Sequence, residues 1–134
     1  MDANAILRYL DPGSASGGDK VRRLFEEAAD NQARLWMSVI NMGEVLYILM
    51  KRAGEEIAFK HVRAIQQVIS LVDADWEQTV QAAILKHHYK LGYADSYAAA
   101  LAIERKATLV SADTAFRKLG RRIRWMKLPP FQAS

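Results

Sequence analysis

Short apolar runs alternate along the chain with longer segments whose apolar residues recur every three or four positions. The first pattern is typical of buried strands and the second of amphipathic helices. Short strands are predicted at Leu35 to Met37, Ser70 to Val72, Thr108 to Val110 and Ile123 to Met126. Because strands and helices alternate, we expect an α/β fold, a three-layer α/β/α sandwich with a short, mainly parallel sheet.

Polar residues and glycines punctuate the segments between these strands. Helices are expected at Asn4 to Leu10, Asp19 to about Asp30, Ser38 to Arg52, within 57–69, from Asp75 toward the turn at Gly92, from Asp95 to near Lys106, and from Asp113 to Gly120. Ser38 and Asp75 are suited to cap their helices, and Gly54 to end one. The Ser- and Gly-rich run from Asp11 to Gly18 is interpreted as a flexible surface loop.

Periodicity also predicts which helix faces are buried. The inner faces are expected to be Val21, Leu24, Phe25 and Ala28 in one helix, and Trp76, Val80, Ala83, Ile84 and His87 in another. His61 and His87, with His88 beside one such face, are interpreted as core or boundary residues rather than ligands. The three tryptophans, Trp36, Trp76 and Trp125, are expected to anchor the core and not to form an aromatic and basic stacking surface.

The length of 134 residues is that of one domain, spanning residues 1–134. The chain has no cysteine, which excludes disulfides and thiolate chemistry. It shows neither a signal-peptide layout nor an apolar stretch of roughly 20 residues. We therefore expect a cytoplasmic protein without a membrane partner.

Four acidic residues, Asp2, Glu44, Asp95 and Asp113, stand where strand-like segments pass into helices. In open α/β sheets, the carboxyl ends of parallel strands and the helix starts that follow them share one edge, where ligands bind. Carboxylates gathered there would repel one another unless a cation neutralised them. An oxygen-only donor set suits Mg²⁺ or Mn²⁺.

Each acid also has a simpler interpretation. Asp95 and Asp113 could merely cap helices. Glu44 lies mid-helix between Ile40 and Ile48, so we expect it to be partly buried, with a proton, a metal or an arginine as its partner. Asp2 alone means nothing, although Asn4 supplies a second oxygen nearby.

The net charge of +4 is unevenly distributed. The C-terminal part of the chain holds Arg105, Lys106, Arg117, Lys118, Arg121, Arg122, Arg124 and Lys127. A basic region near an acidic metal site suits a polyanionic substrate, whose flanking phosphates it could hold. A solvated basic helix face is the simpler interpretation.

Four segments of the chain, taken in order, resemble the acidic motifs of PIN domains, and most closely those of VapC toxins from bacterial VapBC toxin–antitoxin pairs. They are Asp2-Ala3-Asn4-Ala5-Ile6-Leu7, Ser38-Val39-Ile40-Asn41-Met42-Gly43-Glu44-Val45, Gly92-Tyr93-Ala94-Asp95-Ser96-Tyr97-Ala98-Ala99-Ala100-Leu101-Ala102, and Leu109-Val110-Ser111-Ala112-Asp113-Thr114-Ala115-Phe116. The resemblance covers almost the whole chain.

The resemblance implies a metal-dependent endoribonuclease. Asp2, Glu44, Asp95 and Asp113 would be its catalytic and metal-binding residues, with Mg²⁺ or Mn²⁺ as cofactor and Asn4 and Ser111 in support. Water attack on an RNA phosphodiester would leave a 5′-phosphate and a 3′-hydroxyl, and one or two cations can assist it. The family also implies a homodimer and a cognate antitoxin, for which Tyr47, Ile48 and Met50 could form part of a groove.

The first motif departs from the family pattern, because only Met1 precedes Asp2. PIN domains have an apolar strand there, central in the sheet, whose loss would leave neighbouring strands without ladder partners. Either this start is truncated relative to the functional protein or another segment replaces the strand. We expect weak metal affinity for this N-terminus.

Two alternatives differ in kind from a nuclease. A receiver-like phospho-acceptor domain would also place acids at strand ends, but it would need paired acids after its first strand and a lysine after its last, and the chain has neither. A degenerate PIN-like domain could bind RNA or protein without cleaving.

Overall fold

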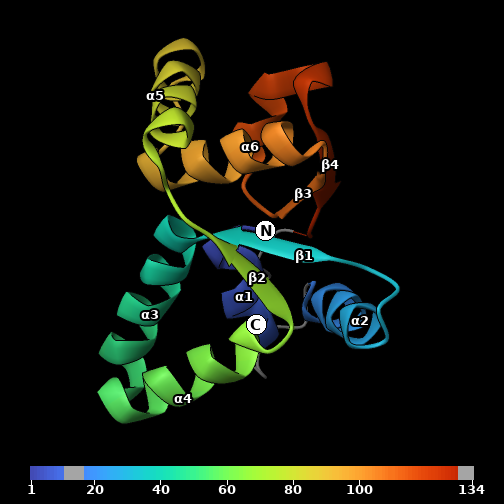
Figure 1. The fold of residues 1–134 in the computed structure, drawn as a ribbon, viewed down its shortest axis with the longest axis vertical. Helices are drawn as coiled ribbons and strands as arrows, with labels where there is room; N and C mark the ends of the chain where they lie inside the picture. Colours follow the sequence, from blue (N-terminus) through green and yellow to red (C-terminus); the bar gives the residue numbers. More distant parts are fainter. Residues whose placement is uncertain (11–16, 130–134) are drawn as a thin grey trace.

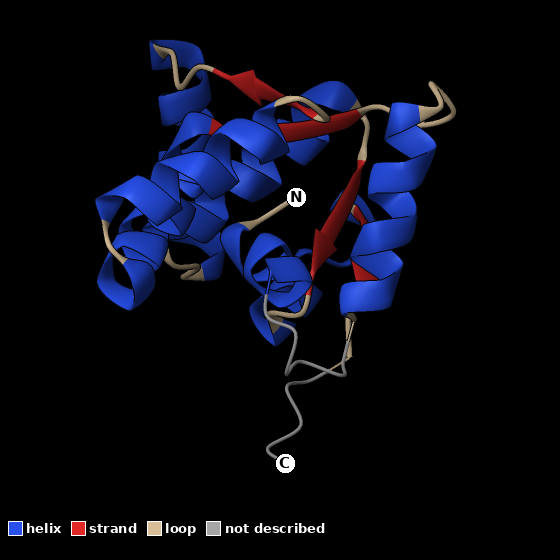
Figure 2. Ribbon diagram, turned by 90° about the horizontal axis from the view of Figure 1, so that it is seen from below, coloured by secondary structure: helices blue, strands red, loops and turns tan. Residues whose placement is uncertain are grey.

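The structure is a computed structural model that describes residues 1–10 and 17–129. Its elements are α1 (Ala3–Leu10), α2 (Gly18–Ala29), β1 (Leu35–Ser38), α3 (Val39–Ala53), α4 (Glu55–Gln66), β2 (Ile69–Val72), α5 (Trp76–Tyr89), α6 (Tyr93–Arg105), β3 (Thr108–Ser111), the 3₁₀ helix η1 (Thr114–Arg122) and β4 (Arg124–Lys127). Figures 1 and 2 show the short strands among the helices. The α/β class is therefore confirmed. The expected loop at Asp11 to Gly18 lies largely outside the described residues, and Gly18 already belongs to α2.

The strands of the described residues form two parallel pairs. β1 pairs with β2, with Leu35 opposite Ile69, and β3 pairs with β4, with Thr108 opposite Arg124. Between the pairs lie the first residues of the chain (Figure 1): the Met1 nitrogen donates to the Trp36 carbonyl at 3.2 Å, and the Asp2 nitrogen donates to that of Val110 at 3.3 Å. Met1 and Asp2 thus bridge β1 and β3 where a central strand would run.

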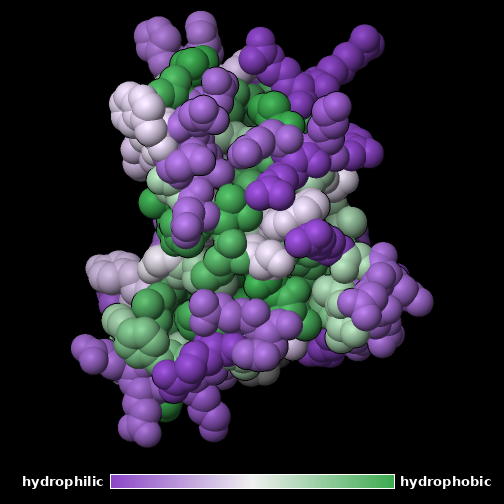
Figure 3. All heavy atoms as spheres, in the orientation of Figure 1, coloured by the Kyte–Doolittle hydropathy of each residue, from purple (hydrophilic) through white to green (hydrophobic). Residues whose placement is uncertain are grey.

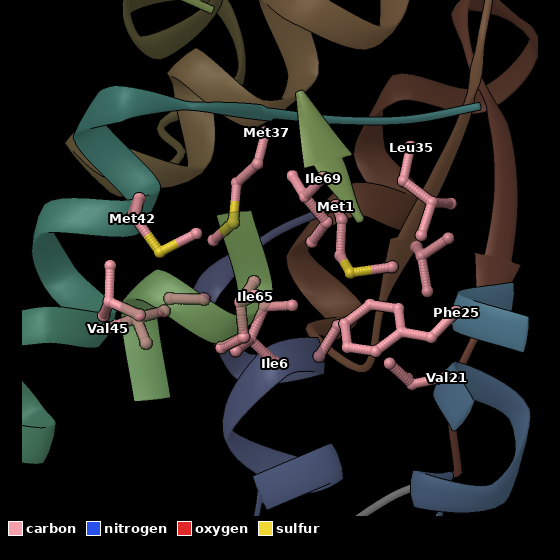
Figure 4. Close-up of a cluster of buried hydrophobic side chains, with 14 of the residues drawn as sticks. Met1, Ile6, Val21, Phe25, Leu35, Met37, Met42, Val45, Ile65 and Ile69 are labelled. Carbon is pink, nitrogen blue, oxygen red and sulfur yellow. The ribbon is translucent and has the colours of Figure 1, made fainter. Parts of the chain in front are cut away.

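Two clusters of buried apolar side chains form the core. One gathers residues of α1, α2, β1, α3 and α4, among them Met1, Ile6 and Phe25, whose side chains point toward one another in Figure 4. The other joins α5 and α6 to β3 and η1 through residues such as Leu85, Tyr97 and Phe116. α6 packs against both α5 and α3, so it connects the two clusters at the point where the acidic motifs converge.

Local capping signals predicted several boundaries correctly. The Ser38 hydroxyl accepts from the Ile40 nitrogen, Asp75 Oδ1 accepts from the Gln78 nitrogen at 2.8 Å, and Gly54 ends α3. Other predicted boundaries were wrong. The helix expected within 57–69 ends at Gln66, and Ile69 already begins β2. Gly92 precedes the first residue of α6, so Asp95 lies inside its first turn instead of opening it. η1 continues past Gly120, which turns the chain with a φ of 54°.

The predicted inner face of α2 is confirmed, because Val21 and Phe25 are buried and Leu24 and Ala28 pack against the core. The predicted inner face of α5 was wrong. Its buried residues are Gln78, Ala82 and Leu85, whereas Trp76 is 76% exposed. Apolar residues occur around much of this helix, and the packing partner decides the face: α5 lies against the alanine-rich α6, which accepts the small Ala82.

The interpretation of the histidines and tryptophans also needs correction. His61, His87 and His88 are all exposed, so none is a core or boundary residue. Trp36 and Trp125 are half-buried, and Trp76 is not a core anchor at all. None of the described helices is long and apolar enough to span a bilayer.

Candidate functional site

One pocket of about 390 Å³ is lined by all four acids of the predicted cluster. Asp2 immediately precedes α1, Glu44 lies in α3, Asp95 lies in the first turn of α6, and Asp113 follows β3. Ala3, Asn4, Arg8 and Ala112 complete its wall. The pocket thus takes its lining from the N-terminal segment, α3, the start of α6 and the segment after β3.

Asp2 is the most deeply buried of the acids, with 3% of its surface exposed. Its Oδ1 accepts from the Ala5 nitrogen at 3.0 Å, as an N-cap of α1 would, and its Oδ2 accepts from the Ser111 hydroxyl. Burial raises the pKa of Asp2, while these two hydrogen bonds oppose the increase. The carboxylate is therefore tied to both α1 and the end of β3.

Asp95 and Asp113 interact directly across the pocket. The pKa of Asp95 is raised to about 7, first by burial, then by its hydrogen bond with Asp113, and further by the charges of Asp113, Asp2 and Glu44. A hydrogen bond between two carboxyl groups requires a proton on one of them. Below about pH 7 this pair therefore holds a proton in the place that a cation could take.

Asp113 also has the capping function of the simpler interpretation. Its Oδ1 accepts from the Ala115 nitrogen at 2.9 Å at the start of η1, and its own nitrogen donates to the Ser111 hydroxyl oxygen at 2.9 Å. Asp95 has no such function, because α6 begins two residues earlier and Gly92 is its N-cap residue. Capping thus explains Asp113 in part and leaves Asp95 unexplained.

Glu44 is exposed, which contradicts the expectation of a partly buried carboxylate. Val45, the next residue, takes the core-facing position in α3 and leaves Glu44 at the mouth of the pocket. Partial desolvation and then the charge of Asp2 raise the pKa of Glu44. Within residues 1–10 and 17–129 it forms no ion pair with an arginine, so that alternative is not supported there.

Two polar residues of the site were not predicted. Arg8 is buried at 6% exposure in the pocket wall, where its Nε donates to Asn4 Oδ1 at 2.9 Å and its guanidinium donates to the Pro129 carbonyl. Asn4 therefore faces the pocket with its oxygen already engaged. The four-residue spacing of Asn4 and Arg8 on one helix was the signal that could have revealed this pair.

Asn41 is the second residue that was missed. It is 1% exposed, and its Nδ2 donates to the Ala94 carbonyl at 3.1 Å, which ties α3 to the first turn of α6 beside Asp95. Its Oδ1 has no hydrogen-bond partner among the described residues. The signal in the sequence is a polar amide, Asn41, within a mostly apolar helix, three residues before Glu44.

The types of donor atom in the pocket suit a hard cation, but the positions of the described side chains do not yet form a binding site. Four carboxylates line the pocket without any histidine or cysteine, a composition that favours Mg²⁺ or Mn²⁺. In the described part of the chain, however, no three of the acidic or histidine side chains are grouped closely enough to hold a metal ion as they stand. Binding would need the Asp95–Asp113 hydrogen bond to open and the exposed Glu44 side chain to turn inward.

A sequence model of the PIN domain matches residues 1–122, which include all four acidic motifs. The chain belongs to the PIN domain family. The resemblance inferred from the motifs is thereby confirmed. No curated protein sequence gives a significant match.

Solved structures of VapC and VapBC proteins share this PIN fold. VapBC2 from Rickettsia felis, bound to a DNA fragment from its promoter, matches with a TM-score of 0.73 at 17% identity, over 95% of this chain and 96% of that one. The sarcin–ricin loop cleaving toxin VapC20 of Mycobacterium tuberculosis matches with 0.68 at 19%, over 89% and 92%. VapBC-1 from nontypeable Haemophilus influenzae gives 0.70 at 16%, over 94% of each chain. At these identities the likeness establishes the fold.

Proposed function

We propose that this PIN domain is a Mg²⁺- or Mn²⁺-dependent endoribonuclease and the toxin of a cytoplasmic toxin–antitoxin pair. The observation that carries the proposal is the convergence of Asp2, Glu44, Asp95 and Asp113, from four separate segments, on one pocket. Membership of the PIN family and the fold shared with VapC toxins support it.

Asp2, Glu44, Asp95 and Asp113 would hold the cation. A bound divalent ion would supply an activated water and stabilise charge on the phosphodiester oxygens. Attack of that water on phosphorus, with the 3′-oxygen as leaving group, would give a 5′-phosphate and a 3′-hydroxyl. The Ser111 hydroxyl orients both acids, because it donates to Asp2 and accepts from the backbone nitrogen of Asp113. Asn4 and Arg8 border the pocket as a hydrogen-bonded pair, so Arg8 places positive charge where a substrate phosphate would enter.

We also propose that the chain forms a homodimer and binds an antitoxin. Two of the similar structures are VapBC complexes, which supports an antitoxin partner. Exposed apolar side chains on α3 and α4, namely Tyr47 at 61%, Ile57 at 47% and Phe59 at 40%, suit a protein contact. Ile48 and Met50 are only half-exposed beside them.

The test is cleavage of structured RNA by the purified chain. Transfer RNA and a hairpin carrying a sarcin–ricin loop are suitable substrates, since one similar toxin cleaves that loop. We expect cleavage with Mn²⁺, none with EDTA, and none by Asp95→Asn. Metal-independent cleavage, or full activity of Asp95→Asn, would refute the proposal.

The second candidate function is RNA or protein binding without cleavage. It is favoured by the lack of a ready group of metal ligands among the described side chains. The same experiment separates the two, because a pure binding domain would retain RNA in Mn²⁺ without producing fragments.

A further inference from the structure

Six exposed basic residues form a surface at the opposite ends of the strands from the acid pocket. We call this surface the basic face, and it comprises Arg34, Arg105, Lys106, Arg121, Arg122 and Arg124. Arg34 immediately precedes β1, Lys106 lies just before β3, and Arg124 begins β4. The acid pocket takes its residues from beyond the other ends of β1 and β3. A four-residue strand spans roughly 10 Å, which sets the scale of the separation.

The basic face contains a cavity with no acidic residue in its wall. It measures about 290 Å³, and its lining combines Lys106, Arg121, Arg122 and Arg124 with an apolar floor that includes Ala102 and Ala107. A smaller neighbouring cavity shares Ala102 and Ala107 and is bordered by Arg34 and Arg105. Strongly hydrophilic side chains crowd the surface over η1, β3 and β4 in Figure 3. The two cavities therefore form one continuous basic surface.

Within the described residues, no carboxylate neutralises these cations. The single ion pair in that part of the chain joins Arg22 to Asp19 on α2, away from the basic face. Glu104 precedes Arg105 in sequence but lines a different cavity, beside Trp76 and Glu77. Unneutralised, clustered guanidinium groups attract polyanions.

Several of these side chains are held in place before any ligand arrives. Arg34 and Arg105 both stack on the ring of Trp36, at 5.4 and 5.3 Å from its centroid. Arg124 donates to the Lys106 carbonyl, and the guanidinium of Arg122 lies 5.5 Å from the Tyr89 ring centroid. Trp36 thus contacts two cations of the basic face through its ring. Guanidinium groups stacked in this way offer N–H edges to phosphates and flat faces to bases.

We propose that the basic face binds the phosphate backbone of single-stranded RNA, at nucleotides flanking the bond that is cut in the acid pocket. The choice of RNA rests on the proposed function. A membrane surface is less suited, because the exposed large apolar residues of the described ranges lie mainly on α3, α4 and α5, and of these residues only Ile103 borders the basic face.

The test uses fluorescence anisotropy with a labelled single-stranded RNA of mixed sequence, in EDTA so that cleavage plays no part. The variant is the triple substitution Arg34→Ala, Arg105→Ala and Arg121→Ala. The matched control is Lys20→Ala, Arg22→Ala and Arg23→Ala, which removes three exposed cations from α2. Circular dichroism confirms that both fold.

We expect the basic-face variant to bind RNA at least tenfold more weakly at low salt, and the control to change affinity less than threefold. Loss of three phosphate contacts should also reduce the slope of log affinity against log salt by about 2. Equal affinity and slope in variant and control would overturn the inference. So would unchanged RNA binding combined with lost binding to a DNA duplex or to phosphatidylserine vesicles.

Failure of this inference is distinguishable from failure of the proposed nuclease. If the chain cleaves RNA in Mn²⁺ but the basic-face variant binds like the control, the basic face is refuted and the nuclease stands. If RNA binding falls in the variant but nothing is cleaved in Mn²⁺, the basic face is supported and the nuclease is refuted.

Discussion

The Ser111 hydroxyl donates to Oδ2 of Asp2 across 109 residues of sequence, and both residues are buried. The same hydroxyl oxygen accepts from the Asp113 nitrogen at 2.9 Å. One small side chain at the end of β3 therefore orients the first and the last acid of the site. The Ser111–Asp2 hydrogen bond also ties the start of the chain to β3, which α1 contacts.

Replacing Ser111 with alanine should weaken both the fold and the site. A buried Asp2 oxygen would lose its donor, which typically costs about 1–3 kcal/mol of unfolding free energy. Urea denaturation measures the loss, and RNA cleavage in Mn²⁺ should fall with it. Ser70→Ala, an exposed serine in β2, is the matched control and should leave both unchanged. Equal effects of the two substitutions would show that the hydroxyl bond contributes nothing.

The raised pKa of Asp95 predicts how stability depends on pH in the absence of metal. The folded chain keeps this proton up to about pH 7, whereas the unfolded chain loses it near 3.8. Between these values the folded state binds more protons, so the free energy of unfolding should decrease as pH rises from about 4 to 7.

Asp95→Asn should remove part of that decrease, because asparagine does not titrate. Urea titrations in EDTA at intervals from pH 4 to 7.5 measure how the free energy of unfolding changes with pH in the wild type and in Asp95→Asn. Parallel curves for the two proteins would mean that Asp95 ionises normally in the folded chain.

Asn41→Leu separates positioning from stability. The substitution deletes an Oδ1 that has no partner among the described residues, together with a hydrogen bond to the Ala94 carbonyl, and it replaces the buried side chain with an apolar one of similar volume. We expect the unfolding free energy to change by less than about 1.5 kcal/mol. RNA cleavage should nevertheless fall at least tenfold, because α3 and the Asp95 turn lose their direct link. Wild-type cleavage at wild-type stability would exclude a positioning role for Asn41.

The corrected face of α5 gives a test of the packing. Leu85→Ala should cost about 2–5 kcal/mol of unfolding free energy, as truncation of a buried leucine does. Trp76→Ala should cost less than about 1 kcal/mol, because that ring is 76% exposed. Thermal or urea unfolding of the two variants decides between the observed face and the one predicted from periodicity, which requires the opposite ranking.

The sequence predicted features that depend on neighbours within one or two helical turns. The caps at Ser38, Asp75 and Asp113 belong to this class, because a side chain and the nitrogen it bonds are two or three residues apart. The four acids could be assigned to one site because the family resemblance indicated that they meet in space, which their spacing in the sequence alone does not show.

Features that depend on distant partners were missed. Arg8 donates to the carbonyl of Pro129, which is 121 residues away, and the stack on Trp36 needs Arg105 from α6. Glu44 was expected to be partly buried because its helix is apolar, but only the packing of α3 decides that Val45 faces the core and Glu44 the pocket. Periodicity does not contain that information.

The proposed nuclease requires the four carboxylates of the pocket to hold a divalent cation jointly. Calorimetric titration of Mn²⁺ into the wild-type chain, Asp95→Asn and Asp73→Asn at pH 8 tests it most directly, since Asp73 is an exposed acid outside the pocket. We predict measurable Mn²⁺ binding by the wild type and by Asp73→Asn, and binding at least tenfold weaker by Asp95→Asn. Equal Mn²⁺ affinity in all three proteins would show that the acids of the pocket do not hold the cation.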